Sequence, residues 1–223
     1  MRFVNGPPKL DDCRDHGADA DNELIIVEGD SAARSVASVR NPQSQAVLPM
    51  QGKPMNAHKA GAARLSANPW FKALIEALGC GIGERFRLEA MRYRRVLLLF
   101  DPDADGIHSG ALMLIFFHRF MPGALTDGRI LMVRAPLLRL TSPMLEQPVY
   151  LSSPAQHPAQ VDALAARGVH EVQTLRYRGL GSLEPALLTS WCVDPQTRHT
   201  EVMKLADAEL AQRYFGGTLP GKS

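Results

Sequence analysis

Long hydrophobic runs are missing from this 223-residue sequence. The longest, 111–117, has seven residues, whereas a membrane-spanning helix needs roughly 20. The segment 1–8 shows no hydrophobic stretch of the kind found in secretory signals. Cysteine is scarce as well, and Cys13, Cys80 and Cys192 form neither a CxxC pair nor a zinc-binding pattern. We therefore expect no membrane partner, a cytoplasmic location, reduced thiols, and core positions for Cys80 and Cys192.

An excess of charge of one sign is also missing. Twenty-five basic residues against 23 acidic ones leave a net charge of +2, so a nucleic-acid partner has to be argued from local patches. The sequence contains no GxSxG, no Walker A pattern and no GxGxxG after a strand, which argues against nucleophilic hydrolases and against ATP sites of those kinds. Hydrophobic residues still make up 45% of the chain, as in globular proteins.

Apolar runs that alternate with helical patterns predict an α/β fold. The expected strands are 24–27, 45–49, 95–100 and 129–133. The expected helices are 32–39, 69–78 and 107–121. Asp30 or Ser31 is the expected N-cap of the first helix. Strands that alternate with helices imply a parallel sheet with helices on both faces.

The two ends of the chain give weaker signals. Residues 1–22 are rich in Asp and poor in apolar residues, so we expect a linker, with order beginning at Glu23. Beyond Pro136 the pattern favours a helix at 158–167, a strand at 169–175 and a helix at 185–191. The expected organisation is therefore a linker (1–22), an α/β domain (23–136) and a smaller C-terminal α+β appendage (137–223).

Carboxylates follow two of the predicted strands. Asp101, Asp103 and Asp105 are spaced two apart after the strand at 95–100, and Glu28 directly follows the strand at 24–27. In an extended stretch such alternate residues point to one side. Parallel neighbouring strands end at the same edge of the sheet, which is where open α/β sheets bind ligands. A hard divalent cation such as Mg²⁺ would relieve the repulsion among these groups.

Two alternatives apply to the aspartates. An EF-hand calcium loop starting at Asp101 would need a glutamate at position 112, which is Leu112, so that interpretation is excluded. If the three aspartates are considered without Glu28, a solvated acidic turn that binds no metal is still a possible interpretation. Glu28 at a second strand end favours metal binding.

Several groups could contact phosphate. Gly29 permits close backbone approach at a helix start, and a patch at 84–95 carries five arginines against two glutamates. The candidate side chains are Lys53, Asn56, Lys59, His108, Arg176 and Arg178. Such groups could follow a phosphate backbone, and a solvated surface is the alternative for each basic patch. For His108, a role in the helix start is an equal alternative to a phosphate contact.

The motifs, in this order, resemble the Toprim segment of type IIA topoisomerase B subunits, as in DNA gyrase and topoisomerase IV. The resemblance covers about 8–205. The matching stretches are 8–13 (PKLDDC), 27–32 (VEGDSA), 45–49 (QAVLP), Gly52-Lys53, Asn56, Lys59-Ala60, 77–83 (ALGCGIG), 101–106 (DPDADG), His108, Phe116-Phe117, Pro136-Leu137, 176–181 (RYRGLG), Asp194-Pro195 and Arg198.

The resemblance implies a Toprim, Rossmann-like fold and a metal-assisted centre that cleaves and religates DNA. It assigns Glu28 as general acid/base and metal ligand, Asp101 and Asp103 as the main Mg²⁺ ligands, and Asp105 as a supporting one. The implied partners are double-stranded DNA and a topoisomerase A-type subunit that supplies the attacking tyrosine. The ATPase domain of the family is not found in this sequence, so a separate ATPase chain is a further expected partner.

The sequence also departs from the family pattern. The changed positions are Ala33 and Arg34 for two glycines, Pro42 for an arginine, Gln51 for a lysine, Phe100 and Pro102 around the first aspartate, Gly110 for an arginine, and Ser182 for a glutamate. Two alternatives therefore stay open. One is a non-catalytic module that binds DNA or an A-type subunit. The other is a stand-alone Mg²⁺-dependent nuclease or phosphotransferase that uses the same carboxylates.

Overall fold

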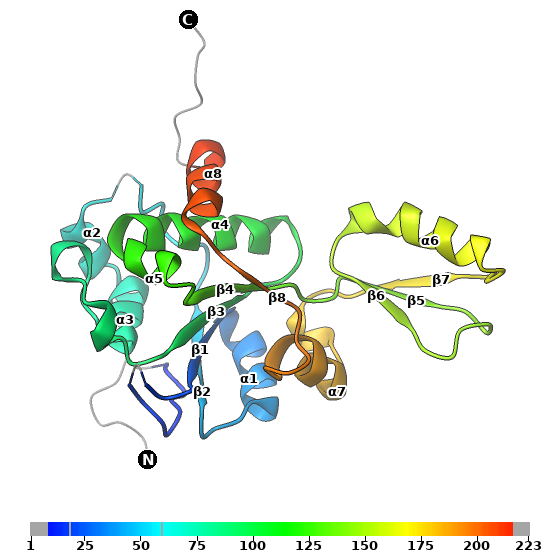
Figure 1. Cartoon of the computed structure of the whole chain (residues 1–223), viewed down its shortest axis with the longest axis horizontal. Coiled ribbons are helices and arrows are strands. Elements are labelled where there is room, and N and C mark those ends of the chain that lie inside the picture. Colours follow the sequence, from blue (N-terminus) through cyan, green and yellow to red (C-terminus); the bar gives the residue numbers. More distant parts are fainter. Residues whose placement is uncertain (1–8, 18, 59, 216–223) are drawn as a thin grey trace, which may run out of the picture.

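A computed structural model describes residues 9–17, 19–58 and 60–215. Its main sheet has five strands in the order β2-β1-β3-β4-β8 (Figure 1). The strands are β1 (Glu23–Glu28), β2 (Gln45–Met50), β3 (Arg95–Leu99), β4 (Ile130–Val133) and β8 (Thr200–Val202). The first four are parallel to one another and β8 is antiparallel to β4. The predicted parallel α/β sheet is confirmed.

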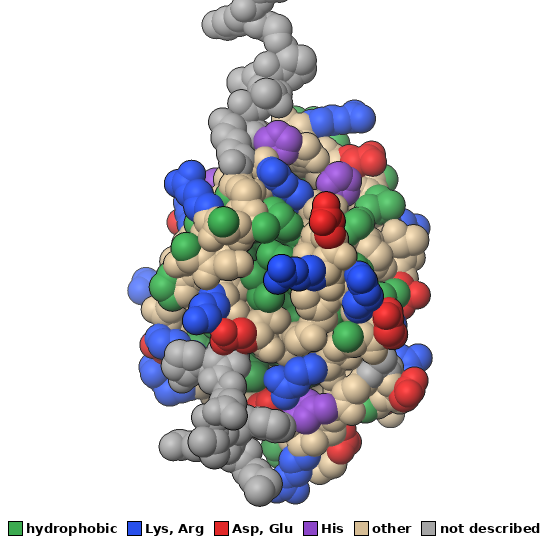
Figure 2. Space-filling view, turned by 90° about the vertical axis from the view of Figure 1, so that its left-hand side faces the viewer, with side chains coloured by type: hydrophobic (Ala, Val, Ile, Leu, Met, Phe, Trp, Pro, Cys, Tyr) green, Lys and Arg blue, Asp and Glu red, His purple; other side chains and the backbone are tan. Residues whose placement is uncertain are grey.

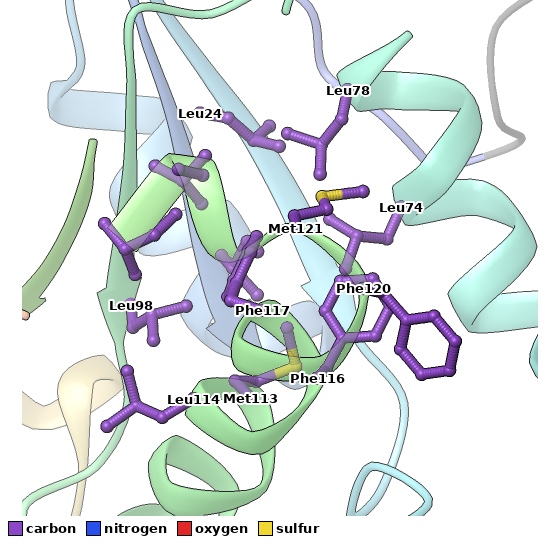
Figure 3. Close-up of a cluster of buried hydrophobic side chains, with 14 of the residues drawn as sticks. Leu24, Leu74, Leu78, Leu98, Met113, Leu114, Phe116, Phe117, Phe120 and Met121 are labelled. Carbon is purple, nitrogen blue, oxygen red and sulfur yellow. The ribbon is translucent and has the colours of Figure 1, made fainter. Parts of the chain in front are cut away.

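Helices cover both faces of this sheet. The elements are α1 (Gly29–Val39), α2 (Ala62–Ala67), α3 (Pro69–Leu78), α4 (Ala104–Phe120), α5 (Pro122–Thr126), α7 (Pro185–Leu188) and α8 (Leu205–Phe215). Side chains alternate along the strands, so Ile26 and Leu98 pack with Phe116 of α4, whereas Val27 and Leu99 face Val36 of α1. Figure 3 shows the first cluster, in which residues of α3 and α4 meet Leu24 and Leu98 of the sheet.

Helix starts differ most from the predictions. α1 begins at Gly29, directly after β1, with Glu28 at the N-cap position and no side-chain cap hydrogen bond, so the predicted Asp30 or Ser31 cap is wrong. α4 begins at Ala104, three residues before the predicted start, because the Asp103 side chain accepts a hydrogen bond from the Gly106 N–H and caps it. The short α2 has no counterpart among the predicted helices.

α3 is the helix that the sequence predicts best. It spans the predicted 69–78, and it ends at Gly79, whose φ of 68° is left-handed. At its start the Asn68 side chain accepts hydrogen bonds from the N–H groups of Trp70 and Phe71, both at 3.1 Å.

Replacing Asn68 by Ala should lower the free energy of unfolding by about 1 kcal/mol, because two helix-end N–H groups lose their acceptor. Chemical denaturation of the full chain measures this loss. Asn68→Asp keeps an acceptor oxygen and should retain most of the stability. Equal losses in the two variants would show that the cap contributes little.

A second, three-stranded sheet lies beside the main sheet, and one helix packs on it (Figure 1). Its strand order is β6-β5-β7, all antiparallel, and α6 (His157–Ala166) packs on it through Leu164. The strands are β5 (Leu138–Thr141), β6 (Val149–Leu151) and β7 (Gln173–Arg176). The predicted strand at 169–175 thus starts four residues late, and the predicted helix at 185–191 becomes α7 followed by a π-helical turn, Thr189–Val193. After this turn the chain returns to the main sheet through β8, and α8 packs against α4.

Residues 9–17 and 19–22, expected as part of a linker, pack against the main sheet. Asp11 forms a bridge with Val47 of β2, and Cys13 and Asn22 are buried. The expectation that order begins at Glu23 is therefore wrong for this segment. Its scarcity of apolar residues is offset by polar contacts, such as the hydrogen bond that Tyr93 donates to Asp12 at 2.6 Å. Cys80 and Cys192 are also buried, as predicted.

Among the described helices, none has the length and hydrophobicity required for a membrane span.

Candidate metal centre

The candidate centre lies where β1 and β3 end. These strands are parallel neighbours, with Val27 paired to Leu99, and neighbouring strands lie about 4.8 Å apart. Glu28 is the last residue of β1, and Asp101 comes two residues after the end of β3. The prediction that the two carboxylate-bearing strand ends lie side by side is therefore confirmed.

The three aspartates are held in different ways. Asp101 Oδ1 accepts a hydrogen bond of 2.9 Å from the Leu180 N–H. Asp103 caps α4, and Asp105 lies in the first turn of that helix, where it forms a 2.7 Å ion pair with Lys53 Nζ. The stretch from Asp101 to Asp105 is not extended throughout, as predicted for two or three converging carboxylates, because α4 begins at Ala104.

The carboxylates nevertheless influence one another electrostatically. The pKa of Glu28 is raised by partial burial and by the negative charges of Asp101, Asp103 and Asp105, against the opposite effect of Lys53. Burial also raises the pKa of Asp101, with Asp103 adding to it and the Leu180 N–H opposing it. At the solvent-exposed edge, the ion pair lowers the pKa of Asp105 and raises that of Lys53. Negative charge is therefore concentrated around Glu28.

This donor set fits a hard divalent cation. Carboxylate oxygens are the preferred ligands of Mg²⁺, and a cation placed among them would remove the repulsion that raises the Glu28 pKa. The oxygens are not gathered around one point, however. The described parts of the chain contain one group of three candidate ligands whose atoms all lie within 4.8 Å of one another. It consists of Asp12, Cys13 and His16, and includes none of these four carboxylates. In that group Asp12 already forms a 2.8 Å ion pair with Arg92.

Two of the predicted DNA-contacting residues lie under the end of α8. Asn56 donates a 2.8 Å hydrogen bond to the carbonyl oxygen of Phe215, and the His108 ring stacks on the Phe215 ring with centroids 5.0 Å apart. Phe215 also lines a cleft of about 510 Å³ that reaches Asp101. α8 thus brings its last turn to the candidate centre from the far end of the chain.

The remaining basic candidates lie around the centre or outside the described residues. Lys53 contacts Asp105, as above, and Arg178 lies two residues before Leu180, whose N–H donates to Asp101. Arg176 ends β7 on the second sheet and is exposed. Lys59 lies outside the described residues.

Two of the five arginines in the patch at 84–95 are held in ion pairs, and the other three are exposed. Arg92 pairs with Asp12, and Arg95 pairs with the buried Glu23 at 2.7 Å and with Asp21. Figure 2 shows that Lys and Arg side chains are interspersed with Asp and Glu around hydrophobic side chains on the side of the molecule that carries α2 and α3. This side therefore presents no surface of a single charge sign.

One element of the centre is absent from the sequence predictions. The turn Gly179–Ser182, which includes a short 3₁₀ helix (Leu180–Ser182), follows β7 and reaches Asp101. Gly179 has a φ of 141°, and a Cβ there would lie 2.7 Å from Asp101 Oδ2. The two closely spaced glycines of the turn, Gly179 and Gly181, were the available sequence signal, but they indicated a turn and not its contact.

A family model for the Toprim domain matches residues 23–134, half of the chain. The chain belongs to the Toprim domain family. The matched region contains β1, β3 and all four carboxylates of the candidate centre. The Toprim chain is 36% identical over 209 residues to the B subunit of DNA gyrase from Archaeoglobus fulgidus, and equally to that from Thermotoga maritima, covering 94% of this chain and 32% of each relative. Identity to the gyrase B subunit from Thermus thermophilus is 35% over 213 residues, covering 33% of that protein. The Toprim chain thus spans about a third of the length of these relatives.

Proposed function

We propose that this chain acts as the Toprim segment of a type IIA topoisomerase B-like subunit. In this proposal Glu28, Asp101, Asp103 and Asp105 hold Mg²⁺ for DNA cleavage and religation, and an A-type subunit supplies the attacking tyrosine. The observation that carries the proposal is the position of Glu28 and Asp101 at neighbouring strand ends, where partial burial and then the negative charges of the aspartates raise the Glu28 pKa. The similarity to the B subunit of DNA gyrase supports the same assignment.

The proposed chemistry follows from the positions of these side chains. Glu28 is the proposed proton donor and acceptor, because partial burial and the neighbouring aspartates raise the pKa of its carboxyl above the ordinary glutamate value. In cleavage it would give a proton to the leaving 3′ oxygen, and in religation take it back. Asp101, oriented by the Leu180 N–H, and Asp103, fixed at the start of α4, are the main proposed ligands, with Asp105 supporting them. When bound, the cation supplies electrostatic stabilisation of the charge that develops on the phosphate.

The DNA contacts are proposed from the groups that flank the carboxylates. Lys53, Arg176 and Arg178 are exposed and could neutralise backbone phosphates. Asn56 and His108 are partly exposed, and both already contact Phe215 at the end of α8. Four points stay predictions: a DNA contact by Lys59, the cytoplasmic location, a separate ATPase chain as partner, and domain boundaries after residues 22 and 136.

Plasmid cleavage tests the proposal. The full chain is mixed with an A-type topoisomerase subunit, supercoiled plasmid and Mg²⁺, and cleaved DNA is trapped with denaturant. We expect linear and nicked products that carry covalently attached A-type subunit, and no products when Mg²⁺ is chelated. Absence of cleavage in the complete mixture, with a B-type subunit of known activity as positive control, would contradict the proposal. Cleavage without any A-type subunit would identify a stand-alone nuclease instead.

A non-catalytic binding module is the second candidate. The observation that favours it is the contact of Phe215 with both Asn56 and His108, which covers two of the residues expected to meet DNA. Gln51, where the family has a lysine, hydrogen-bonds to Asp30 at 2.9 Å instead of offering a positive charge. Stable association with an A-type subunit or DNA, unchanged by removal of Mg²⁺ and accompanied by no cleavage, would support this candidate.

A further inference from the structure

A turn from outside the Toprim-matched region reaches the candidate centre. Residues Gly179–Ser182 connect β7 of the second sheet to α7, and Leu180 N–H donates to Asp101 Oδ1 across 79 positions of sequence. A hydrogen bond from a backbone N–H to a carboxylate is charge-assisted and directional. It therefore fixes the rotation of the Asp101 side chain.

The turn is itself rigidly held. The Leu180 side chain is 1% exposed and packs in the same core cluster as Ala32 and Val36 of α1. The Ser182 hydroxyl donates a 2.6 Å hydrogen bond to the Gly179 carbonyl and accepts one from the Arg178 N–H. Because both the side chain and the backbone of the turn are anchored, the direction of the Leu180 N–H is fixed by the fold.

The turn approaches Asp101 so closely that only glycine fits at position 179. A Cβ on Gly179 would lie 2.7 Å from Asp101 Oδ2 and 3.2 Å from its carboxyl carbon and from Oδ1. A φ of 141° further disfavours any residue with a side chain. Gly179 is thus required for the carboxylate and the Leu180 N–H to meet.

We infer that the Gly179–Ser182 turn is a positioning element for Asp101, through which the second sheet and α7 set the orientation of a metal-binding carboxylate. The inference rests on the proposed function in that Asp101 is taken as a Mg²⁺ ligand. Groups that orient metal ligands typically change metal affinity 10- to 100-fold when they are removed.

Calorimetric titration of Mg²⁺ into the full chain tests the inference. Gly179→Ala should weaken Mg²⁺ binding at least tenfold, since the new Cβ displaces the Asp101 carboxylate. Gly168→Ala is the matched control, because Gly168 also has a positive φ, 77°, but its Cβ would meet nothing within 4 Å. Gly168→Ala should bind Mg²⁺ like the unmodified chain, and equal affinities in the two variants would overturn the inference.

A backbone substitution guards against misfolding of the Gly179 variant. Replacing the Leu180 amide by an ester removes the N–H donor and leaves every side chain in place. The control is an ester at Leu188, whose N–H donates to the Glu184 carbonyl at 2.9 Å within α7. The Leu180 ester should lose Mg²⁺ affinity and the Leu188 ester should not, although each loses one hydrogen bond donated by a backbone N–H. Equal Mg²⁺ affinities in the two esters would overturn the inference.

Hydrogen exchange separates this inference from the proposed function, because it needs no metal. Exchange of the Leu180 amide should be faster in Asp101→Ala than in Asp103→Ala, since only Asp101 accepts from that N–H. Equal exchange rates would overturn the positioning role. If the unmodified chain binds no Mg²⁺ but the exchange rates differ as expected, the proposed function fails while the positioning of Asp101 by the turn stands.

Discussion

Glu28→Gln is expected to reduce Mg²⁺-dependent DNA cleavage, assayed with an A-type subunit, by roughly 10²- to 10⁴-fold, the range typical for loss of a general acid or base. Glutamine keeps the size of the side chain but can neither carry the proton nor supply a negative charge. The structural reason for choosing Glu28 is its place at the end of β1, where partial burial and the nearby aspartates raise its pKa. The rate of plasmid linearisation measures the effect.

Two comparisons make this result specific. Glu209→Gln changes an exposed glutamate of α8 and should leave cleavage unchanged. Thermal unfolding of Glu28→Gln should match or exceed that of the unmodified chain, because removal of one of four like charges relieves repulsion. Cleavage by Glu28→Gln at the unmodified rate would show that the centre does not use this carboxyl.

The second large effect concerns stability. Arg198→Met should lower the free energy of unfolding by about 3 kcal/mol, because the buried Glu23 carboxylate loses its most buried cationic partner and keeps only the half-buried Arg95 beside it. The side chains of Arg198 and Glu23 are 4% and 2% exposed, and the guanidinium donates to both carboxylate oxygens at 2.5 and 2.6 Å. The pair joins the segment before β8 to β1, so it ties the returning chain to the main sheet. Urea denaturation measures the loss.

An exposed ion pair provides the contrast. Lys72→Ala removes the exposed pair with Glu76, four residues along α3 and 3.8 Å away, and should cost no more than about 0.5 kcal/mol. A loss for Arg198→Met as small as that for Lys72→Ala would contradict the role assigned to the buried pair.

The same pair predicts a pH dependence of stability. Burial by itself raises the pKa of Glu23, but hydrogen bonds and charge from Arg198, with further hydrogen bonds from Gln45 and Arg95, hold it below its ordinary value of 4.5. A depressed folded-state pKa gives stability that is complete above the unfolded-state value and is lost as the pH falls through the folded-state value. Stability should therefore decline below about pH 4.5, and Arg198→Met should show less of this decline. Parallel pH profiles for the two proteins would contradict the assignment.

The four parallel strands of the main sheet could be predicted because they are continuous apolar runs. β1 and β3 are buried on both faces, and α3 has a helix-capping asparagine and a terminal glycine within the local sequence. The second sheet, and β8 at the edge of the main sheet, could not be predicted in the same way. β7 is exposed along its whole length, β6 has three residues, and β8 acquires its strand conformation by pairing with β4, some seventy positions away. Such strands depend on partners that no local pattern reveals.

The candidate centre was predictable only to the level of the strand ends. That Glu28 and Asp101 lie at one edge follows from parallel neighbouring strands. The divergence of the aspartates does not, because Asp103 takes the N-cap position of α4 and Asp105 pairs with Lys53. The contact of Leu180 with Asp101 and that of Phe215 with His108 join segments about 80 and 107 positions apart. These contacts arise from tertiary packing.

The most direct test of the shared cation is a double-mutant cycle on Mg²⁺ affinity. Calorimetry on the unmodified chain, Glu28→Gln, Asp101→Asn and the double variant gives four affinities. If both carboxylates hold one ion, each single variant loses affinity and the double variant loses clearly less than the sum of the two single losses expressed as free energies. Strictly additive losses, or an affinity that neither substitution changes, would contradict the account.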